Sequence, residues 1–234
     1  MNIDAHFIQF AVIQLIMLVL SICVHEFGHA YVADRLGDPL PRSQGRVTLN
    51  PLAHIDPIGT LLFPLIGMWA AASHSVLAGR TLGWGKPVFV SMHARYMTRR
   101  ISMQMSDLLI SMAGPAMNVL MAALLSGIFV LLLRLGFPLY DAERDMPLFA
   151  NYVASMIQLN LGLAMFNLLP CPPLDGGAII RYLLPREHPV VLALERYGQF
   201  IFLALLLTGG LRFIMGPATW LTQSWIALLF RLAS

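Results

Sequence analysis

Apolar residues in this chain gather in long runs with few polar positions between them. The runs at residues 7–24 and 108–133 contain no charged side chain. A helix needs about 20 apolar residues to cross the hydrocarbon core of a bilayer, and both runs are of that size. We therefore expect transmembrane helices at five places, each closed by Gly, Pro or Arg. Their ranges are 7–32, 108–133, 148–169, 197–211 and 213–230.

A sixth apolar run, at residues 58–73, is shorter. As a helix it would reach roughly 24 Å, against a hydrocarbon core of about 30 Å. Because Pro64 also lies near its middle, we expect this run to enter the membrane and turn back. The segments before and after it, 42–57 and 86–91, have the extended character of short strands or hairpins, most clearly in the alternating residues 46–49.

The composition is that of an integral membrane protein. Of the 234 residues, 58% are hydrophobic and 12% are charged, about half the charge of an ordinary soluble domain. Mean hydropathy is +0.72, and a soluble surface would need many more polar side chains. No repeat or long polar block divides the chain. We predict one domain over residues 1–234, an all-α polytopic membrane protein with five to six transmembrane helices, a re-entrant segment and short membrane-associated strands.

The net charge of +3 comes from basic residues that are scattered over short loops. No basic or aromatic motif accompanies them, so we expect a lipid bilayer around the protein and no nucleic-acid partner. The first apolar run is about twice as long as a signal-peptide core and lacks a basic stretch before it, so we expect it to stay in the mature protein. Cys23 and Cys171 lie in or beside apolar segments and are expected to pack as small hydrophobic residues.

The first apolar run contains the sequence His25-Glu26-Phe27-Gly28-His29. Residues four apart on a helix lie one turn above each other, so the two imidazoles converge. Neutral imidazole is a preferred zinc ligand, and the glutamate beside it can accept a proton from a water molecule that the ion activates. Ionisable side chains inside a membrane span are costly, which argues against a purely structural role. The motif predicts one Zn²⁺ ion per chain.

A catalytic zinc ion usually has three protein ligands and one open position. We assign the third ligand to Asp175, which lies in a stretch rich in proline and glycine just after the run at 148–169. The prolines end the preceding helix, and Gly176 and Gly177 let the backbone approach closely. The alternative is that Asp175 only caps the short helix that follows it. That alternative leaves the histidine pair without a third ligand.

Two motifs together carry a family resemblance. They are H-E-x-x-H in the first span and N-x-x-P-x-x-x-L-D-G at residues 167–176. Their combination resembles the site-2 protease family of intramembrane zinc metallopeptidases, in particular compact bacterial members without an appended PDZ or nucleotide-sensing domain. The resemblance covers most of the chain and includes residues 50–59, 83–88 and 114–118.

The resemblance implies a role for each matching residue. His25, His29 and Asp175 are implied as zinc ligands and Glu26 as the general base. Asn167 is implied as a polar group near the metal that helps to hold the substrate or the oxyanion. The implied substrate is a membrane-tethered protein, cleaved in or near its transmembrane helix.

Two further positions in the family motifs leave alternatives open. Asn118 is implied as a residue that supports the site, and a buried amide bonded to a neighbouring helix is an equal alternative. Many relatives read K-P-V-P-V-N where residues 86–91 read K-P-V-F-V-S. Phe89 and Ser91 therefore replace a proline and an asparagine, and the role of those two positions is open.

The metal site also restricts the topology. His25 lies near the end of its span and Asp175 just beyond the end of another, so both ends must emerge on one face. An even number of crossings must separate them, and the runs at 108–133 and 148–169 supply two. Residues 58–73 should therefore not cross.

This topology separates the charged residues clearly. Of the 15 Lys and Arg residues, those left on the face away from the metal are Arg134, Arg144 and Arg212. The positive-inside rule then places the active site toward the cytoplasm and the N-terminus outside, in a multi-pass protein of the cell (inner) membrane.

We expect hydrolysis of a peptide bond in a locally unwound substrate, which the extended segments near Val47 or Val88 could hold as an added strand. The main alternative is a non-enzymatic zinc-binding membrane transporter or sensor that uses the same histidines. Another is a zinc hydrolase that acts on lipidated or soluble peptides. His54 and Asp56 lie in a proline-flanked turn and are expected to stabilise that turn rather than to bind a second metal ion.

Overall fold

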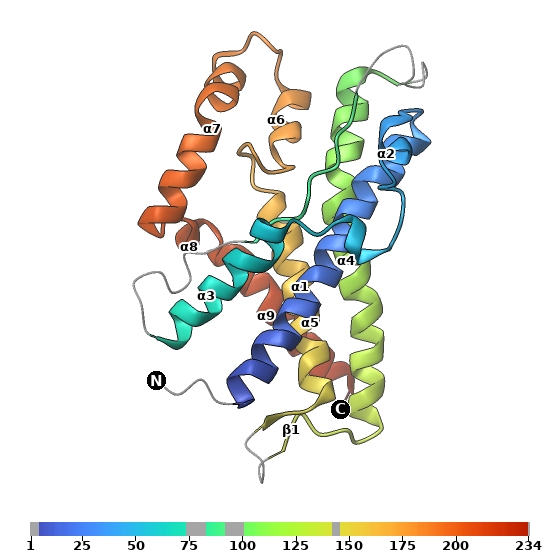
Figure 1. Cartoon of the computed structure of the whole chain (residues 1–234), viewed down its shortest axis with the longest axis vertical. Helices are drawn as coiled ribbons and strands as arrows, with labels where there is room; N and C mark the ends of the chain where they lie inside the picture. Colours follow the sequence, from blue (N-terminus) through green and yellow to red (C-terminus); the bar gives the residue numbers. More distant parts are fainter. Residues whose placement is uncertain (1–4, 74–82, 92–100, 142–145, 234) are drawn as a thin grey trace.

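The computed structural model describes residues 5–73, 83–91, 101–141 and 146–233 (Figure 1). Almost all elements are helices, and a hairpin of two short strands lies between α4 and α5. In chain order the elements are α1 (Ala5–Arg35), α2 (Leu40–Ser43), η1 (Pro51–Ala53), η2 (Pro57–Leu62), α3 (Phe63–Ala72), α4 (Met103–Arg134), β1 (Tyr140–Asp141), β2 (Met146–Pro147), α5 (Phe149–Asn167), α6 (Gly177–Leu183), α7 (Pro189–Thr208), α8 (Leu211–Ile214) and α9 (Gly216–Ala233).

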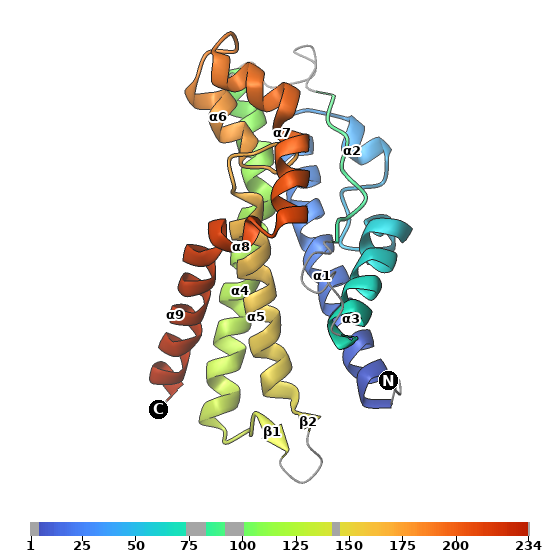
Figure 2. The same cartoon turned by 90° about the vertical axis from the view of Figure 1, so that its left-hand side faces the viewer.

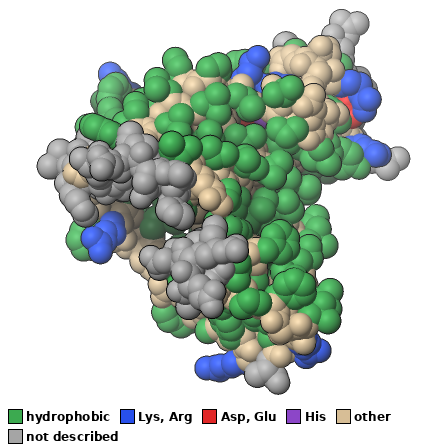
Figure 3. All heavy atoms as spheres, turned by 60° about the horizontal axis from the view of Figure 1, so that its bottom comes forward, with side chains coloured by type: hydrophobic (Ala, Val, Ile, Leu, Met, Phe, Trp, Pro, Cys, Tyr) green, Lys and Arg blue, Asp and Glu red, His purple; other side chains and the backbone are tan. Residues whose placement is uncertain are grey.

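Three long helices, α1, α4 and α5, lie side by side and form the centre of the molecule (Figures 1 and 2). Phe129 of α4 and Ile157 of α5 are fully buried in the apolar core, and Leu229 of α9 packs into the same core. On the outside, large apolar side chains such as Leu124 and Phe200 are exposed. Apolar side chains also dominate the face in Figure 3, where Lys and Arg lie toward the edges. Such a surface suits lipid rather than water.

In the described part of the chain, four helices are long and apolar enough to cross a membrane: α1, α4, α5 and α7. The expectation of an all-α membrane protein is therefore confirmed, but that of five to six transmembrane helices is not. We expected two complete spans at 197–211 and 213–230. Instead, α7 leads from the end of the molecule where α6 lies to its middle, and after α8 the helix α9 continues to the end where the C-terminus lies (Figure 2).

The sequence could not predict this difference. Two consecutive apolar helices have the same pattern whether they pack as an antiparallel pair, each crossing the membrane, or continue in the same direction along the molecule. The break between α7 and α9 includes Gly209 and Gly210, a pair that favours a kink or turn. One charge changes its place as a result. Arg231, in the last turn of α9, lies at the end of the molecule opposite α6, whereas five spans would put it on the same membrane face as the metal site.

After the apolar segment at 58–73, the chain comes back to the place where that segment starts. The segment forms η2 and α3, and by Trp84 the chain is again beside the start of η2. The Trp84 N–H donates to the Gly59 carbonyl at 3.1 Å, and the Lys86 N–H donates to the His54 carbonyl at 2.9 Å. This return agrees with a segment that enters the membrane without crossing it.

The short strands expected at 46–49 and 86–91 are not formed. Both segments are described, but neither belongs to a β-ladder among the described residues, and the chain bends at Val47 and Thr48. The buried guanidinium of Arg46 instead donates to the backbone carbonyls of Ala53, Lys86 and Pro87. A side chain thus uses the acceptors that a ladder would need, and Pro87 has no N–H to donate.

Candidate metal centre

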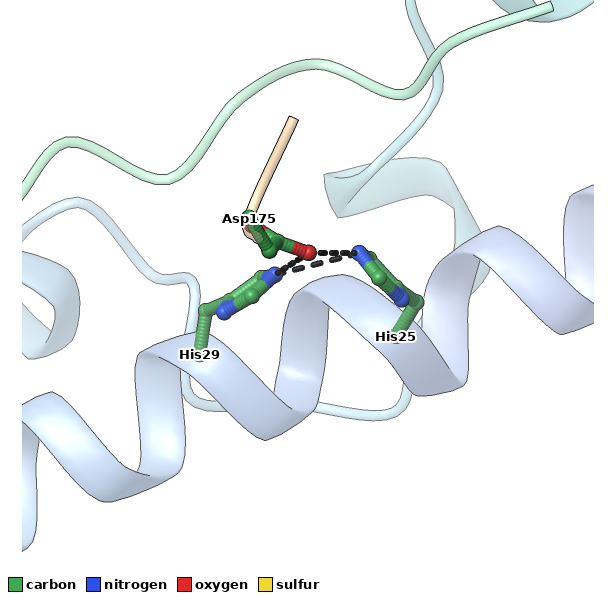
Figure 4. A group of neighbouring side chains, drawn as sticks. All are labelled: His25, His29 and Asp175. Atoms are coloured by element: carbon green, nitrogen blue, oxygen red, sulfur yellow. Dashed lines mark hydrogen bonds and ion pairs between the residues drawn. The ribbon is translucent and has the colours of Figure 1, made fainter. Parts of the chain in front are cut away.

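His25 and His29 lie one turn apart on the same face of α1, as their spacing predicts (Figure 4). Their Nε2 atoms are 3.1 Å apart. The rings meet edge to face with their centroids 4.7 Å apart. The helical spacing therefore places both imidazoles on one face of α1, with their Nε2 atoms close together.

Asp175 reaches this point from the turn between α5 and α6. Its Oδ2 atom lies 3.2 Å from the Nε2 of His25 and 3.4 Å from the Nε2 of His29 (Figure 4). The structure thus brings together the three residues predicted as zinc ligands, although about 150 positions of sequence separate the aspartate from the histidines.

The turn that carries Asp175 is closed tightly against the end of α5. The N–H of Gly176 donates to the carbonyl of Asn167 at 2.7 Å. A Cβ atom at position 176 would collide with the backbone carbonyl oxygens of Leu168 and Leu169. Only glycine permits this close approach, which explains the L-D-G sequence at the ligand.

Hydrogen bonds behind the two rings fix which nitrogen carries the proton. The Nδ1 of His29 lies 2.7 Å from the carbonyl oxygen of Ile110, which can only accept, so Nδ1 donates and, in the neutral ring that binds a metal, Nε2 carries the lone pair. The Nδ1 of His25 likewise donates to Oδ1 of Asn118 at 2.6 Å. Both Nε2 lone pairs therefore face the carboxylate of Asp175.

The ligand atoms of these three residues lie within 4.8 Å of one another. The Asp175 Oδ2 is buried and has no hydrogen-bond partner among the described residues. Two nitrogen lone pairs and a carboxylate oxygen repel each other at this distance unless a cation lies between them. Two imidazoles and one carboxylate form a ligand set that zinc prefers, and they leave a fourth position open. The residues fit a catalytic zinc ion.

Glu26 follows the first histidine and is half-buried. A Cβ atom placed on Gly85 would lie 3.4 Å from its Oε1 atom, so the segment 83–91 passes directly beside this carboxylate. Among the described residues Glu26 has no hydrogen-bond partner. Its carboxylate oxygens are therefore free to accept a hydrogen bond from a water molecule.

The chain matches Peptidase family M50 over residues 13–209. That range contains both histidines, the glutamate and Asp175. The chain belongs to peptidase family M50. It is 35% identical over 203 residues to YwhC of Bacillus subtilis, covering 86% of this chain and 83% of that protein, which is named as a zinc metalloprotease.

Two mycobacterial proteins named Rip2, also as zinc metalloproteases, are similar to this M50 chain. The Mycolicibacterium smegmatis protein is 33% identical over 195 residues, 82% of this chain and 66% of its own. The Mycobacterium tuberculosis protein is 34% identical over 190 residues, 80% of this chain and 63% of its own. No solved structure matches the chain. The resemblance to the site-2 proteases is thus confirmed: the protein is an intramembrane zinc metalloprotease of this family, and a transporter or sensor is not favoured.

Asn167 lies in the last turn of α5 in this M50 chain, close to the turn that holds Asp175. Its Nδ2 donates to the carbonyl of Leu163 at 3.0 Å, within its own helix. Its backbone carbonyl accepts from Gly176. The described contacts of Asn167 therefore serve the geometry of the ligand turn, and its role toward a substrate stays a prediction.

One face of α4 supports the metal centre through residues spaced three and four apart. Ile110 and Asn118 accept hydrogen bonds from the imidazoles. At Gly114, between them, a Cβ atom would collide with both rings. Asp107, one turn before Ile110, forms an ion pair of 2.9 Å with Arg181 of α6. The family resemblance covers Gly114 and Asn118 and implied a supporting role for Asn118 alone. Asp107 and Arg181 belong to no motif, and their pairing was missed.

The serine that departs from the family pattern has a clear contact. Ser91 donates from its N–H at 2.6 Å and from its hydroxyl at 2.8 Å to the carboxylate of Asp38, which is buried just after α1. A polar side chain at position 91 thus fastens the segment 83–91 to the end of α1. Phe89 is exposed, and nothing in the structure explains why it replaces a proline.

His54 and Asp56 stabilise their turn, as expected. The Nε2 of His54 donates to the carbonyl of Thr48 at 2.9 Å, and burial lowers the pKa of this imidazole. The carboxylate of Asp56 accepts from the N–H groups of Ile58 and Gly59 at the start of η2. Neither residue belongs to the group of metal-ligating side chains found in the described part of the chain.

Proposed function

We propose that His25, His29 and Asp175 hold one zinc ion and that Glu26 is the general base in the hydrolysis of a peptide bond. One observation carries this assignment. Two imidazole nitrogens and a carboxylate oxygen, each with a free lone pair, meet within 4.8 Å, and the carboxylate of Glu26 follows directly on the same helix.

A zinc ion held by these three residues would lower the pKa of a water molecule to about 7 and would polarise the scissile carbonyl. Glu26 accepts a proton from the attacking water and passes it to the leaving nitrogen, so that the product leaves as a neutral amine. Asn167 donates to the oxyanion that develops on the carbonyl oxygen. Its Nδ2 has two N–H groups, and one bond to Leu163 leaves the second for the substrate.

The proposed substrate is a transmembrane segment of a membrane-tethered protein that unwinds locally before cleavage. Unwinding is required because the carbonyls of a helix are engaged in intrahelical hydrogen bonds. The segment 83–91 supports this proposal because it passes beside Glu26 and residues 88–90 make no backbone–backbone hydrogen bond with the described chain. An unwound substrate can add to this segment as a strand.

The proposed orientation places the N-terminus outside the cell membrane and the metal centre toward the cytoplasmic face. Its support is the charge distribution and the arrangement of the elements. α2 and α6 lie at the same end of the molecule (Figure 1). They carry Arg42 and Arg181, and Arg35 ends α1 nearby. Under the positive-inside rule this end faces the cytoplasm.

The test is a comparison of two substrates in one assay with the purified protein in lipid vesicles. One is a single-span membrane protein, and the other is a soluble peptide with the same residues around the cleavage site. We expect cleavage of the membrane protein alone, its loss after treatment with a chelator and its recovery with added zinc. Equal cleavage of the soluble peptide would contradict the proposed substrate class.

A further inference from the structure

The bundle contains a chain of buried side-chain hydrogen bonds behind the metal centre. It connects Ser21 of α1, Asn118 of α4 and Asn160 of α5, and each of these residues has a relative exposure of 0%. Polar side chains inside a membrane protein are costly unless they are bonded, and they mark functional sites when they occur. Of the three, only Asn118 lies in a stretch that carries the family resemblance.

Each bond in this chain has a defined direction. The Nδ2 of Asn118 donates to the Oδ1 of Asn160 at 2.8 Å and to the backbone carbonyl of Ser21 at 3.2 Å. The Nδ2 of Asn160 donates to the hydroxyl of Ser21 at 2.9 Å and to the carbonyl of Met156 at 2.9 Å. The hydroxyl of Ser21 donates to the carbonyl of Met17 at 2.8 Å.

The far ends of the chain are backbone carbonyls, which can only accept hydrogen bonds. The amide of Asn160 must therefore turn its Nδ2 toward Met156 and its Oδ1 toward Asn118. Asn118 must then turn its own Nδ2 toward Asn160 and its Oδ1 toward His25. Neither amide can flip without placing two acceptors or two donors against each other in a buried site.

The direction of these hydrogen bonds decides which ring nitrogen of His25 carries the proton. Because Oδ1 of Asn118 faces the imidazole at 2.6 Å, the proton of His25 is held on Nδ1. The lone pair on Nε2 is then free at the point where His29 and Asp175 meet. Groups behind a metal ligand that fix its tautomer and orientation raise the affinity for the metal.

We infer that Asn160 and Ser21 are positioning residues for His25, acting through Asn118 to hold its imidazole in the tautomer that binds metal. This inference rests on the proposed role of His25 as a zinc ligand. Neither residue touches the metal centre itself. Their action passes along three hydrogen bonds that run from one helix to another.

The chain offers a closely matched control for Ser21. Ser126 of α4 is also buried, its hydroxyl donates to the carbonyl four residues before it at 2.7 Å, and it accepts from the Nε1 of Trp225 at 2.9 Å. Ser21→Ala and Ser126→Ala therefore each remove one hydrogen bond donated to the preceding helical turn and one accepted from a side chain of another helix. Of the two serines, only Ser21 belongs to the series of hydrogen bonds behind His25.

The experiment compares the wild type with Ser21→Ala, Asn160→Leu and Ser126→Ala, purified in the same detergent. Zinc affinity is measured by competition with a chelator of known affinity. We expect Asn160→Leu to bind zinc about tenfold more weakly, a smaller loss for Ser21→Ala and no change for Ser126→Ala. Thermal unfolding of the metal-free proteins should show similar losses of stability for the two serine variants.

A second readout does not depend on the metal. In metal-free protein labelled with ¹⁵N-histidine, the ring of His25 should show a single tautomer protonated at Nδ1 in the wild type and in Ser126→Ala. It should show a mixture of tautomers in Asn160→Leu. Unchanged zinc affinity and an unchanged tautomer in Asn160→Leu would overturn the inference. A wild type with the Nδ1 tautomer but no zinc affinity would instead contradict the proposed function.

Discussion

Asp107 of α4 and Arg181 of α6 form an ion pair in which Nε lies 2.9 Å from Oδ2. α6 begins just after Asp175, and Asp107 lies one turn before Ile110, whose carbonyl holds His29. The pair therefore ties the turn that carries one proposed ligand to the helix that orients the other two.

We expect Asp107→Asn to weaken zinc binding by about threefold to fivefold. Both partners are about one third exposed, and ion pairs of this kind contribute about 0.2–1 kcal/mol. Chelator competition measures the change. Asp34→Asn is the matched control, because it removes an ion pair of 2.7 Å with the exposed Arg42. An equal loss of affinity in the two variants would show that Asp107 has no special link to the metal centre.

Gly114→Ala should disrupt the metal centre. The added methyl group would collide with the imidazoles of both His25 and His29, and such overpacking costs about 1–3 kcal/mol and displaces the rings. We expect zinc affinity to fall by at least about tenfold, as measured by competition. Gly127→Ala on the same helix is the control, since its Cβ would meet nothing within 4 Å. Full zinc affinity in Gly114→Ala would mean that the rings are not packed as described.

The proposed pairing of a substrate strand with residues 88–90 predicts a difference between two proline substitutions. Residues 88 and 89 of an extended segment present their N–H groups on opposite sides. Val88→Pro should lower cleavage of a full-length substrate by about tenfold, because one ladder hydrogen bond is lost and the ring obstructs its edge. Phe89→Pro restores the residue of many relatives and should be tolerated. Unchanged cleavage in a folded Val88→Pro protein would refute the pairing.

The metal centre was predictable because its signals are local in sequence. Helical spacing alone brings His25 and His29 together, and the dense prolines and glycines around Asp175 indicate a tight turn at the end of a helix. The apolar runs likewise predict helices by their length, as α1, α4 and α5 demonstrate.

The features that were missed depend on contacts between distant parts of the chain. Asp107 and Arg181 are 74 positions apart, and no pattern in either region indicates their pairing. Hydrogen bonds from the Arg46 guanidinium take the place of the expected strand pairing, and they reach carbonyls up to 41 positions away. Asn160 is one of several amides in the apolar helix α5, and its partners become visible only when α1, α4 and α5 are packed together.

The most direct test of the proposed mechanism is the behaviour of Glu26→Gln. The substitution keeps the size of the side chain and leaves His25, His29 and Asp175 in place, but an amide cannot accept the proton of the attacking water. Zinc content and cleavage of a single-span substrate should be measured on the wild type and the variant in parallel. We predict about one zinc per chain in both proteins and cleavage by the wild type alone. Undiminished cleavage by Glu26→Gln would contradict its role as the general base.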